Sequence, residues 1–130
     1  MTVPVRIQLS RAKGWRMPEN TVRVTRPGPW GNPYAVWREP WEHSWLVSRD
    51  SEHHVAPSKA DAQRLAVDLF RALVTDTRAA SRRGAYAHPT DIMKGLRGKN
   101  LACWCALDAP CHADVLLELA NAPVCEAVAP

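Results

Sequence analysis

Near its carboxyl end the chain reads Asn100-Leu-Ala-Cys-Trp-Cys-Ala-Leu-Asp-Ala-Pro-Cys-His-Ala-Asp-Val-Leu-Leu-Glu-Leu-Ala-Asn121, and this stretch decides the fold. Residues 100–105 form a short apolar run that suits a buried strand. Residues 106–110 contain Asp and Pro and are typical of a turn. From residue 111 to residue 121 apolar side chains recur at helical spacing, which predicts an amphipathic helix. The sequence therefore predicts a strand that turns directly into the final helix.

Alternating apolar and polar residues predict two strands earlier in the chain, at 5–9 and 21–25. A further short strand is expected within 41–48. Prolines, glycines and polar residues interrupt the pattern between these segments, and each proline also removes a backbone donor. The segments expected to be loops are 10–20, 26–34 and 50–57.

Two helices are predicted in the second half of the chain. Ser58 followed by Asp61 resembles a capping box with Asp in place of the usual Glu, so a helix is expected from here to about Thr75. Its buried stripe consists of Leu65, Ala66, Leu69, Phe70 and Leu73. The stretch that follows, to Gly84, is interpreted as a frayed helix end or a loop. Thr90 is expected to cap a short helix that runs through Leu96 and ends at Gly98.

Length and composition indicate one soluble globular domain. The chain has 130 residues, of which 46% are hydrophobic and 23% are charged. Strands followed by helix, helix, strand and helix predict an α/β fold, with a short mixed sheet flanked by about three helices. We expect a single domain over residues 1–123 and a loose tail over 124–130. With no long apolar run and no secretory signal, the protein is expected in the cytoplasm, away from membranes.

A cluster of cysteine and histidine residues lies at the predicted turn from strand to helix. Cys103 and Cys105 are two residues apart on the strand, so both side chains leave the same face. The turn then brings Cys111 and His112 beside them. In a reducing cytoplasm such cysteines suit metal ligation, and Cys-x-Cys-x5-Cys-His supplies the ligand atoms that zinc prefers. The residues that could replace His112 as the fourth ligand are His53, His54 and His88.

A second chemistry at the same cluster needs no metal. Cys111 at a helix N-terminus is favoured as a thiolate, so Cys111 and His112 could act as nucleophile and proton carrier. The same helix start could instead hold a phosphate through its backbone amides. Cysteines can also simply be buried residues. Zinc, with Cys103, Cys105, Cys111 and His112 as ligands, is the favoured hypothesis, and Cys125 is interpreted as incidental.

Basic and aromatic residues alternate in the loops of the first third of the chain. The formal net charge is +4, and much of the excess lies early in the sequence. Such loops suit an anionic ligand, because the charges hold phosphate and a ring stacks on a base. The candidate ligand-binding residues are Lys13, Trp15, Arg16, Arg26, Trp30 and Asn32. Alternatively, the tryptophan rings seal the core beneath long loops, an interpretation favoured for Trp37 and Trp41.

Several of these strings together resemble a known family. They are Arg6-Ile-Gln-Leu-Ser-Arg11 with Lys13-Gly-Trp-Arg16, Trp30-Gly-Asn-Pro-Tyr34, Leu96-Arg-Gly-Lys-Asn-Leu-Ala-Cys-Trp-Cys105, and Cys111-His-Ala-Asp-Val-Leu116. The family is domain of unknown function 4326, of bacteria and their phages, and the resemblance runs from about residue 5 to residue 121. It implies a small α/β protein with shared features at these loops and at the Cys/His cluster, and no settled activity. A proline often follows the second cysteine in the family, where Ala106 stands here.

A weaker similarity links the chain to domain of unknown function 488. Members of that family also end a strand and open a helix with Cys-His or a lone His, and some of them lack the cysteines. The similarity implies an active-site role for the position of His112.

Two functional hypotheses follow. In the first, the protein is a nucleotide-linked enzyme or binding protein in which Arg16, Arg26 and Asn32 hold an anionic ligand beside the Cys/His site. In the second, it is a non-catalytic zinc protein whose basic loops bind nucleic acid or a partner protein.

Overall fold

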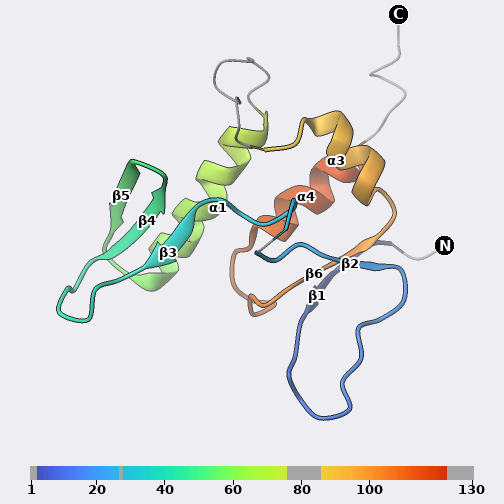
Figure 1. The fold of residues 1–130 in the computed structure, drawn as a ribbon, viewed down its shortest axis with the longest axis horizontal. Coiled ribbons are helices and arrows are strands. Elements are labelled where there is room, and N and C mark those ends of the chain that lie inside the picture. Colours follow the sequence, from blue (N-terminus) through green and yellow to red (C-terminus); the bar gives the residue numbers. More distant parts are fainter. Residues whose placement is uncertain (1–2, 27, 76–85, 123–130) are drawn as a thin grey trace, which may run out of the picture.

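Two small three-stranded sheets and the helices packed on them make up the part of the chain that the computed structural model describes, residues 3–26, 28–75 and 86–122 (Figure 1). This arrangement confirms the predicted α/β class with about three helices. The strands divide between a parallel sheet and an antiparallel sheet. The predictions for residues 76–84, for Cys125 and for the tail lie outside the described residues.

The parallel sheet contains the strand that leads to the cysteine cluster. It consists of β1 (Arg6–Gln8), β6 (Asn100–Cys103) and β2 (Thr21–Arg23), with β6 in the middle. Leu101 and Ala102 of β6 are fully buried, as the apolar run predicts. All three strands lie within their predicted segments, although β6 ends at Cys103. Cys105 therefore lies in the loop that follows the strand.

The antiparallel sheet consists of β3 (Ala35–Trp37), β4 (Trp45–Arg49) and β5 (Glu52–Ala56). The strand expected within 41–48 exists but begins at Trp45, and β3 was not predicted. The prediction of a loop over 50–57 is wrong. Asp50 adopts a positive φ of 52° and closes a tight turn, after which the chain returns as the edge strand β5. Its polar residues misled the prediction because one side of this edge strand faces solvent.

Two tryptophans near this sheet do not seal the core. Trp37 is 37% exposed and Trp41 is 75% exposed, so the interpretation favoured for them is wrong. The Trp37 indole N–H instead donates to the Ser48 hydroxyl at 3.1 Å on the neighbouring strand. The core of this part of the protein needs no cover from these rings. The helix over residues 59–75 covers the face of the sheet that carries Val36 and Val47, and the Trp37 ring lies on the opposite face.

Three helices complete the described fold: α1 (Lys59–Thr75), α3 (Pro89–Leu96) and α4 (His112–Ala120). As predicted, Ser58 starts α1, where its hydroxyl accepts the Asp61 backbone N–H at 3.1 Å and donates to the Asp61 carboxylate at 3.0 Å. The predicted cap of α3 at Thr90 is wrong. His88 caps this helix, because Pro89 suits its first turn and His88 Nδ1 accepts the Thr90 backbone N–H.

Helix α1 lies between the antiparallel sheet and α4 (Figure 1), and its side chains take part in two hydrophobic clusters. Phe70 and Val74 of α1 pack with residues of α3, β6 and α4, including Ile92, Leu101 and Leu116. On another side of α1, small residues such as Ala62 and Ala66 pack against the antiparallel sheet. Helix α1 thereby links the parallel sheet and α4 to the antiparallel sheet. Within the described residues, no helix has the length and apolar character that a membrane span requires.

Candidate metal centre

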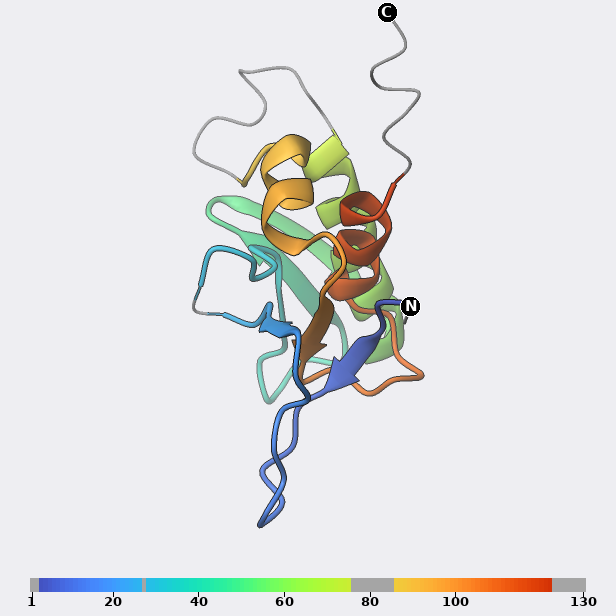
Figure 2. The same cartoon turned by 90° about the vertical axis from the view of Figure 1, so that its right-hand side faces the viewer.

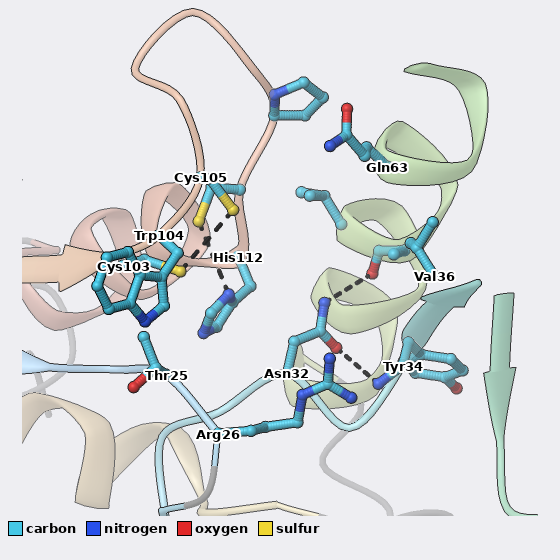
Figure 3. Close-up of a pocket in the computed structure, with 14 residues that line it drawn as sticks. Thr25, Arg26, Asn32, Tyr34, Val36, Gln63, Cys103, Trp104, Cys105 and His112 are labelled. Atoms are coloured by element: carbon cyan, nitrogen blue, oxygen red, sulfur yellow. Dashed lines mark hydrogen bonds between the residues drawn. The ribbon is translucent and has the colours of Figure 1, made fainter. Parts of the chain in front are cut away.

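The Cys/His cluster forms where β6 ends and α4 begins. Cys103 is the last residue of β6, Cys111 is the N-cap of α4, and His112 is the first residue of that helix. The loop between them returns the chain to the carboxyl end of the parallel sheet, where ligands gather in α/β proteins. As predicted, the four side chains of the cluster lie together (Figure 3).

The distances between the ligand atoms suit a single metal ion. The sulfur atoms of Cys103 and Cys105 are 3.8 Å apart, and Cys111 Sγ is 3.8 Å from His112 Nδ1. Ligand atoms of Cys103, Cys111 and His112 all lie within 4.8 Å of one another. In a tetrahedral zinc site with Zn–S bonds of about 2.3 Å, neighbouring sulfurs are about 3.8 Å apart. Three of the predicted ligands thus form a group that could hold a metal ion, and the fourth, Cys105, adjoins it.

The protonation state of His112 follows from its hydrogen bonds. Its Nε2 lies 2.7 Å from the carbonyl oxygen of Val24 and 3.1 Å from that of Trp30. Carbonyl oxygens only accept, so Nε2 carries the proton and Nδ1 presents a lone pair to the sulfurs. His112 is only 6% exposed, and burial lowers its pKa, which favours the neutral imidazole. Metal-binding histidines are oriented by this kind of second hydrogen bond.

The three thiols influence one another's ionisation. Hydrogen bonds from Cys105 and Cys111 lower the pKa of the Cys103 thiol. The same contacts raise the pKa of Cys105 and of Cys111, chiefly because each of these thiols donates its proton toward Cys103, and also because further thiolates would repel the first. Cys111 is also only 1% exposed. Its raised pKa and its burial do not support a reactive thiolate at Cys111, whereas a divalent cation would stabilise all three thiolates together.

A pocket of about 410 Å³ opens beside the cluster. All four residues of the cluster line it on one side, and Arg26, Asn32 and Tyr34 line it on another (Figure 3). Gln63 and Ala66 of α1 contribute a further wall. The volume suits a small molecule such as a mononucleotide.

The predicted ligand-binding residues divide into groups by position. Arg26 is exposed and lines the pocket. Asn32 also lines it, but its side chain is occupied: Nδ2 donates to the Ala66 carbonyl at 3.3 Å, and Oδ1 accepts the Tyr34 backbone N–H at 2.9 Å. The Trp30 ring packs beside Tyr86 and Gly95, outside the pocket lining.

The other three candidates lie on the loop over residues 10–20, which projects from the body of the protein (Figure 2). Lys13, Trp15 and Arg16 are all exposed there, and none of them lines the pocket. The structure therefore does not unite the six predicted ligand-binding residues in one place.

The alternative histidine ligands are excluded by their positions. His53 Nδ1 lies 2.9 Å from the Ser48 hydroxyl, and His54 Nε2 lies 2.6 Å from the Glu52 carboxylate, both in the antiparallel sheet. His88 caps α3. None of the three belongs to the metal-binding group, so the fourth-ligand alternatives at these histidines are wrong.

The family described as Domain of unknown function (DUF4326) matches residues 7–122, and the chain belongs to this family. The match covers the parallel sheet apart from Arg6, and it also covers the cysteine cluster and all three described helices. No curated protein and no solved structure matches the chain.

Proposed function

We propose that this member of the family binds one zinc ion through Cys103, Cys105, Cys111 and His112, and that the metal centre forms one wall of a pocket for a small anionic ligand. The observation that carries the proposal is the orientation of His112. Both carbonyl contacts of Nε2 turn Nδ1 toward Cys111 Sγ, which lies 3.8 Å away. Together with Cys103 these residues place their ligand atoms within 4.8 Å of one another, a spacing that suits one zinc ion. A cluster of free thiols suits a reducing compartment, so we also propose a cytoplasmic location.

The place of Cys105 decides what the metal would do. Its sulfur adjoins Cys103 and its side chain is half-buried at the pocket wall. With Cys105 bound, four protein ligands close the site and the ion stabilises the fold. With Cys105 displaced, the fourth position faces the pocket, where zinc would polarise an oxygen of a bound ligand.

Metal analysis tests the proposal directly. Protein purified without chelator is expected to contain about one zinc per chain. Cys103→Ser and Cys111→Ser are expected to lose the metal, whereas Cys125→Ser, which also removes one thiol, is the matched control. Metal-free wild-type protein that also fails to take up added zinc would overturn the proposal. Loss of zinc in the Cys125 variant would show that the ligand set is incorrect.

Arg26 supports the anionic ligand, which we propose to be of nucleotide type. Its guanidinium is the cationic group of the pocket lining, and the pocket has the volume of a mononucleotide. Calorimetric titration of zinc-loaded protein with the four ribonucleoside monophosphates tests this step. Arg26→Gln is expected to weaken binding about 10-fold or more, because a charge-assisted hydrogen bond contributes about 1.5–3 kcal/mol. Arg16→Gln removes the same charge from the projecting loop and should leave binding unchanged. Absence of nucleotide binding would overturn the proposed nucleotide ligand without contradicting the proposed zinc site.

A second candidate function is binding of single-stranded nucleic acid by the projecting loop. The observation that favours it is the Arg11 guanidinium, which lies 4.4 Å from the ring centroid of Trp104 and so joins the loop to the rim of the pocket. Cationic side chains beside an exposed ring are a common way to hold a nucleic acid backbone and base. Fluorescence anisotropy with a short labelled oligonucleotide should show affinity that falls with salt, and a smaller salt slope for Lys13→Ala and Arg16→Ala. Salt-independent binding would contradict this candidate.

A further inference from the structure

Arg6 of β1 reaches the loop that separates two of the proposed ligands. Its Nη2 atom lies 3.0 Å from the carbonyl oxygen of Ala106, 2.6 Å from that of Leu107 and 3.0 Å from that of Ala109. These three residues belong to the loop between Cys105 and Cys111. The side chain of Arg6 is only 7% exposed, although Ala106 and Leu107 of the loop are themselves exposed.

The same guanidinium also reaches the helix that carries His112. Its Nη1 atom lies 3.5 Å from the Asp114 carboxylate in the first turn of α4. Arg6 therefore connects the parallel sheet, the loop and the helix start, which are the three elements that set the relative positions of the ligands. Three carbonyl oxygens that point toward one place need a cation or several donors at that place, because their dipoles would otherwise repel.

We infer that Arg6 is a positioning residue for the metal centre, which holds the loop over residues 106–110 so that Cys105 and Cys111 face one ion. The inference rests on the proposed function. Arg6 itself does not contact the metal. It acts as an outer partner that fixes the ligands before the metal arrives, and loss of such partners typically lowers metal affinity.

Zinc affinity, measured by competition with a chromophoric chelator, is the first test. Arg6→Gln is expected to lower the affinity about 10- to 100-fold. The matched control is Arg97→Gln. Arg97 likewise donates to two carbonyl oxygens, those of Ala120 and Ala122, but at the far end of α4. Both variants lose one positive charge and the hydrogen bonds that the arginine donates to carbonyl oxygens, so a general loss of stability would affect both. Only Arg6→Gln should lose zinc affinity.

The spectrum of bound Co²⁺ is the second test, because it reports ligand geometry at full occupancy. The Arg6 variant is expected to show altered d–d bands at saturating Co²⁺, and the Arg97 variant is expected to match wild type. If Arg6→Gln does not fold, Arg6→Lys takes its place, since it keeps the charge but reaches fewer carbonyl groups. It is expected to bind zinc about 3- to 10-fold more weakly.

The outcomes separate this inference from the proposed function. Wild-type protein that binds no zinc would overturn the metal site itself. Wild-type protein that binds zinc, with equal affinity in the folded Arg6 variant, would overturn the role of Arg6 alone. An equal loss in the Arg97 variant would reduce Arg6 to a general contributor to stability and would likewise overturn the inference.

Discussion

The imidazole of His112 donates through Nε2 to the carbonyl oxygen of Val24 at 2.7 Å, across 88 positions of sequence. Val24 directly follows the edge strand β2, so this bond ties the helix that carries the proposed ligands to the end of the parallel sheet. The phenyl ring of Phe70 meets the imidazole edge-on at 5.3 Å between ring centroids, which completes the enclosure of the ring. The orientation of His112 is thus set by the fold before any metal binds.

Replacement of this histidine should remove a metal ligand. We expect His112→Asn to bind zinc at least about 100-fold more weakly than wild type, because a direct ligand matters at least as much as an outer partner. Chelator competition measures the change. The control is His53→Asn on the exposed side of β5, which should retain wild-type affinity. Unchanged zinc affinity in the His112 variant would contradict the ligand assignment.

The strand, turn and helix that carry the cluster could be predicted because their signals are local. Apolar runs, turn residues and helical spacing over residues 100–121 are properties of neighbouring residues, and so is the Ser58 cap of α1. The structure therefore confirms the place where the cluster forms. Proximity in sequence also placed Cys103, Cys105 and Cys111 near one another.

The remaining features depend on contacts between distant segments. Strands β3 and β5 are stabilised by pairing with β4, and their own residues carry only weak periodicity. The bonds of His112 Nε2 and the loop contacts of Arg6 join residues about 80 to 100 positions apart, which no local pattern reports. Local sequence patterns therefore assign Arg6 no role of its own. Asn32 was interpreted as a ligand-binding residue because a polar side chain in a rigid turn looks the same whether it faces a ligand or the backbone.

Acid should destabilise the metal-free protein through His112. Burial lowers the pKa of this histidine in the folded chain, while the unfolded chain titrates near about 6.5. The unfolded state therefore binds the proton at a higher pH than the folded state does. The contribution of His112 to stability is full above the unfolded pKa and is lost as the pH falls toward the folded pKa. We expect the free energy of unfolding in urea, with chelator present, to fall by up to about 1.4 kcal/mol per pH unit from this group.

The Cys103 thiol contributes a pH dependence of the same sign, since its pKa is also lowered in the folded state. A variant is therefore needed to separate the contribution of His112 to the pH dependence of stability from that of Cys103. His112→Gln should show a shallower decline between about pH 7 and about pH 5 than wild type. Identical slopes for the two proteins would show that the buried histidine does not govern this transition.

Gly31 is expected to tolerate no side chain. A Cβ atom there would lie 2.5 Å from Arg26 Cγ and 3.1 Å from both the Cα and the N of Arg26, so part of the clash is with backbone. Gly31→Ala should lower the free energy of unfolding by about 1–3 kcal/mol, measured by urea denaturation. Because Trp30 adjoins this residue and its carbonyl accepts from His112, zinc affinity should fall as well.

The control for this change is Pro29→Ala, at an exposed position of the same loop. It should alter the free energy of unfolding by no more than about 1 kcal/mol, since it removes a conformational restriction and no packing contact. A Gly31→Ala protein as stable as wild type would mean that the loop can shift away from Arg26 without cost.

Asn32 provides the last prediction, because the structure gives it a role in stability. Its side chain bridges α1 and the entry to β3, through the Ala66 carbonyl and the Tyr34 backbone N–H. Asn32→Ala should lower the free energy of unfolding by about 1–3 kcal/mol, because the Tyr34 backbone N–H loses its side-chain acceptor and the Ala66 carbonyl, inside α1, loses its second donor. Asn32→Asp keeps the acceptor for Tyr34 but loses the donor to Ala66, so its cost should lie between those of wild type and Asn32→Ala.

Stability and ligand binding then report different things about Asn32. If its role is to hold the loop, the Asp and Ala variants should rank by stability in urea, and nucleotide affinity at saturating zinc should fall less than it does for Arg26→Gln. The opposite pattern would be wild-type stability with a loss of nucleotide binding as large as that of Arg26→Gln. That result would support the prediction that Asn32 binds the ligand. It would mean that the side-chain amide breaks its hydrogen bond to the Ala66 carbonyl and donates to the ligand when the ligand binds.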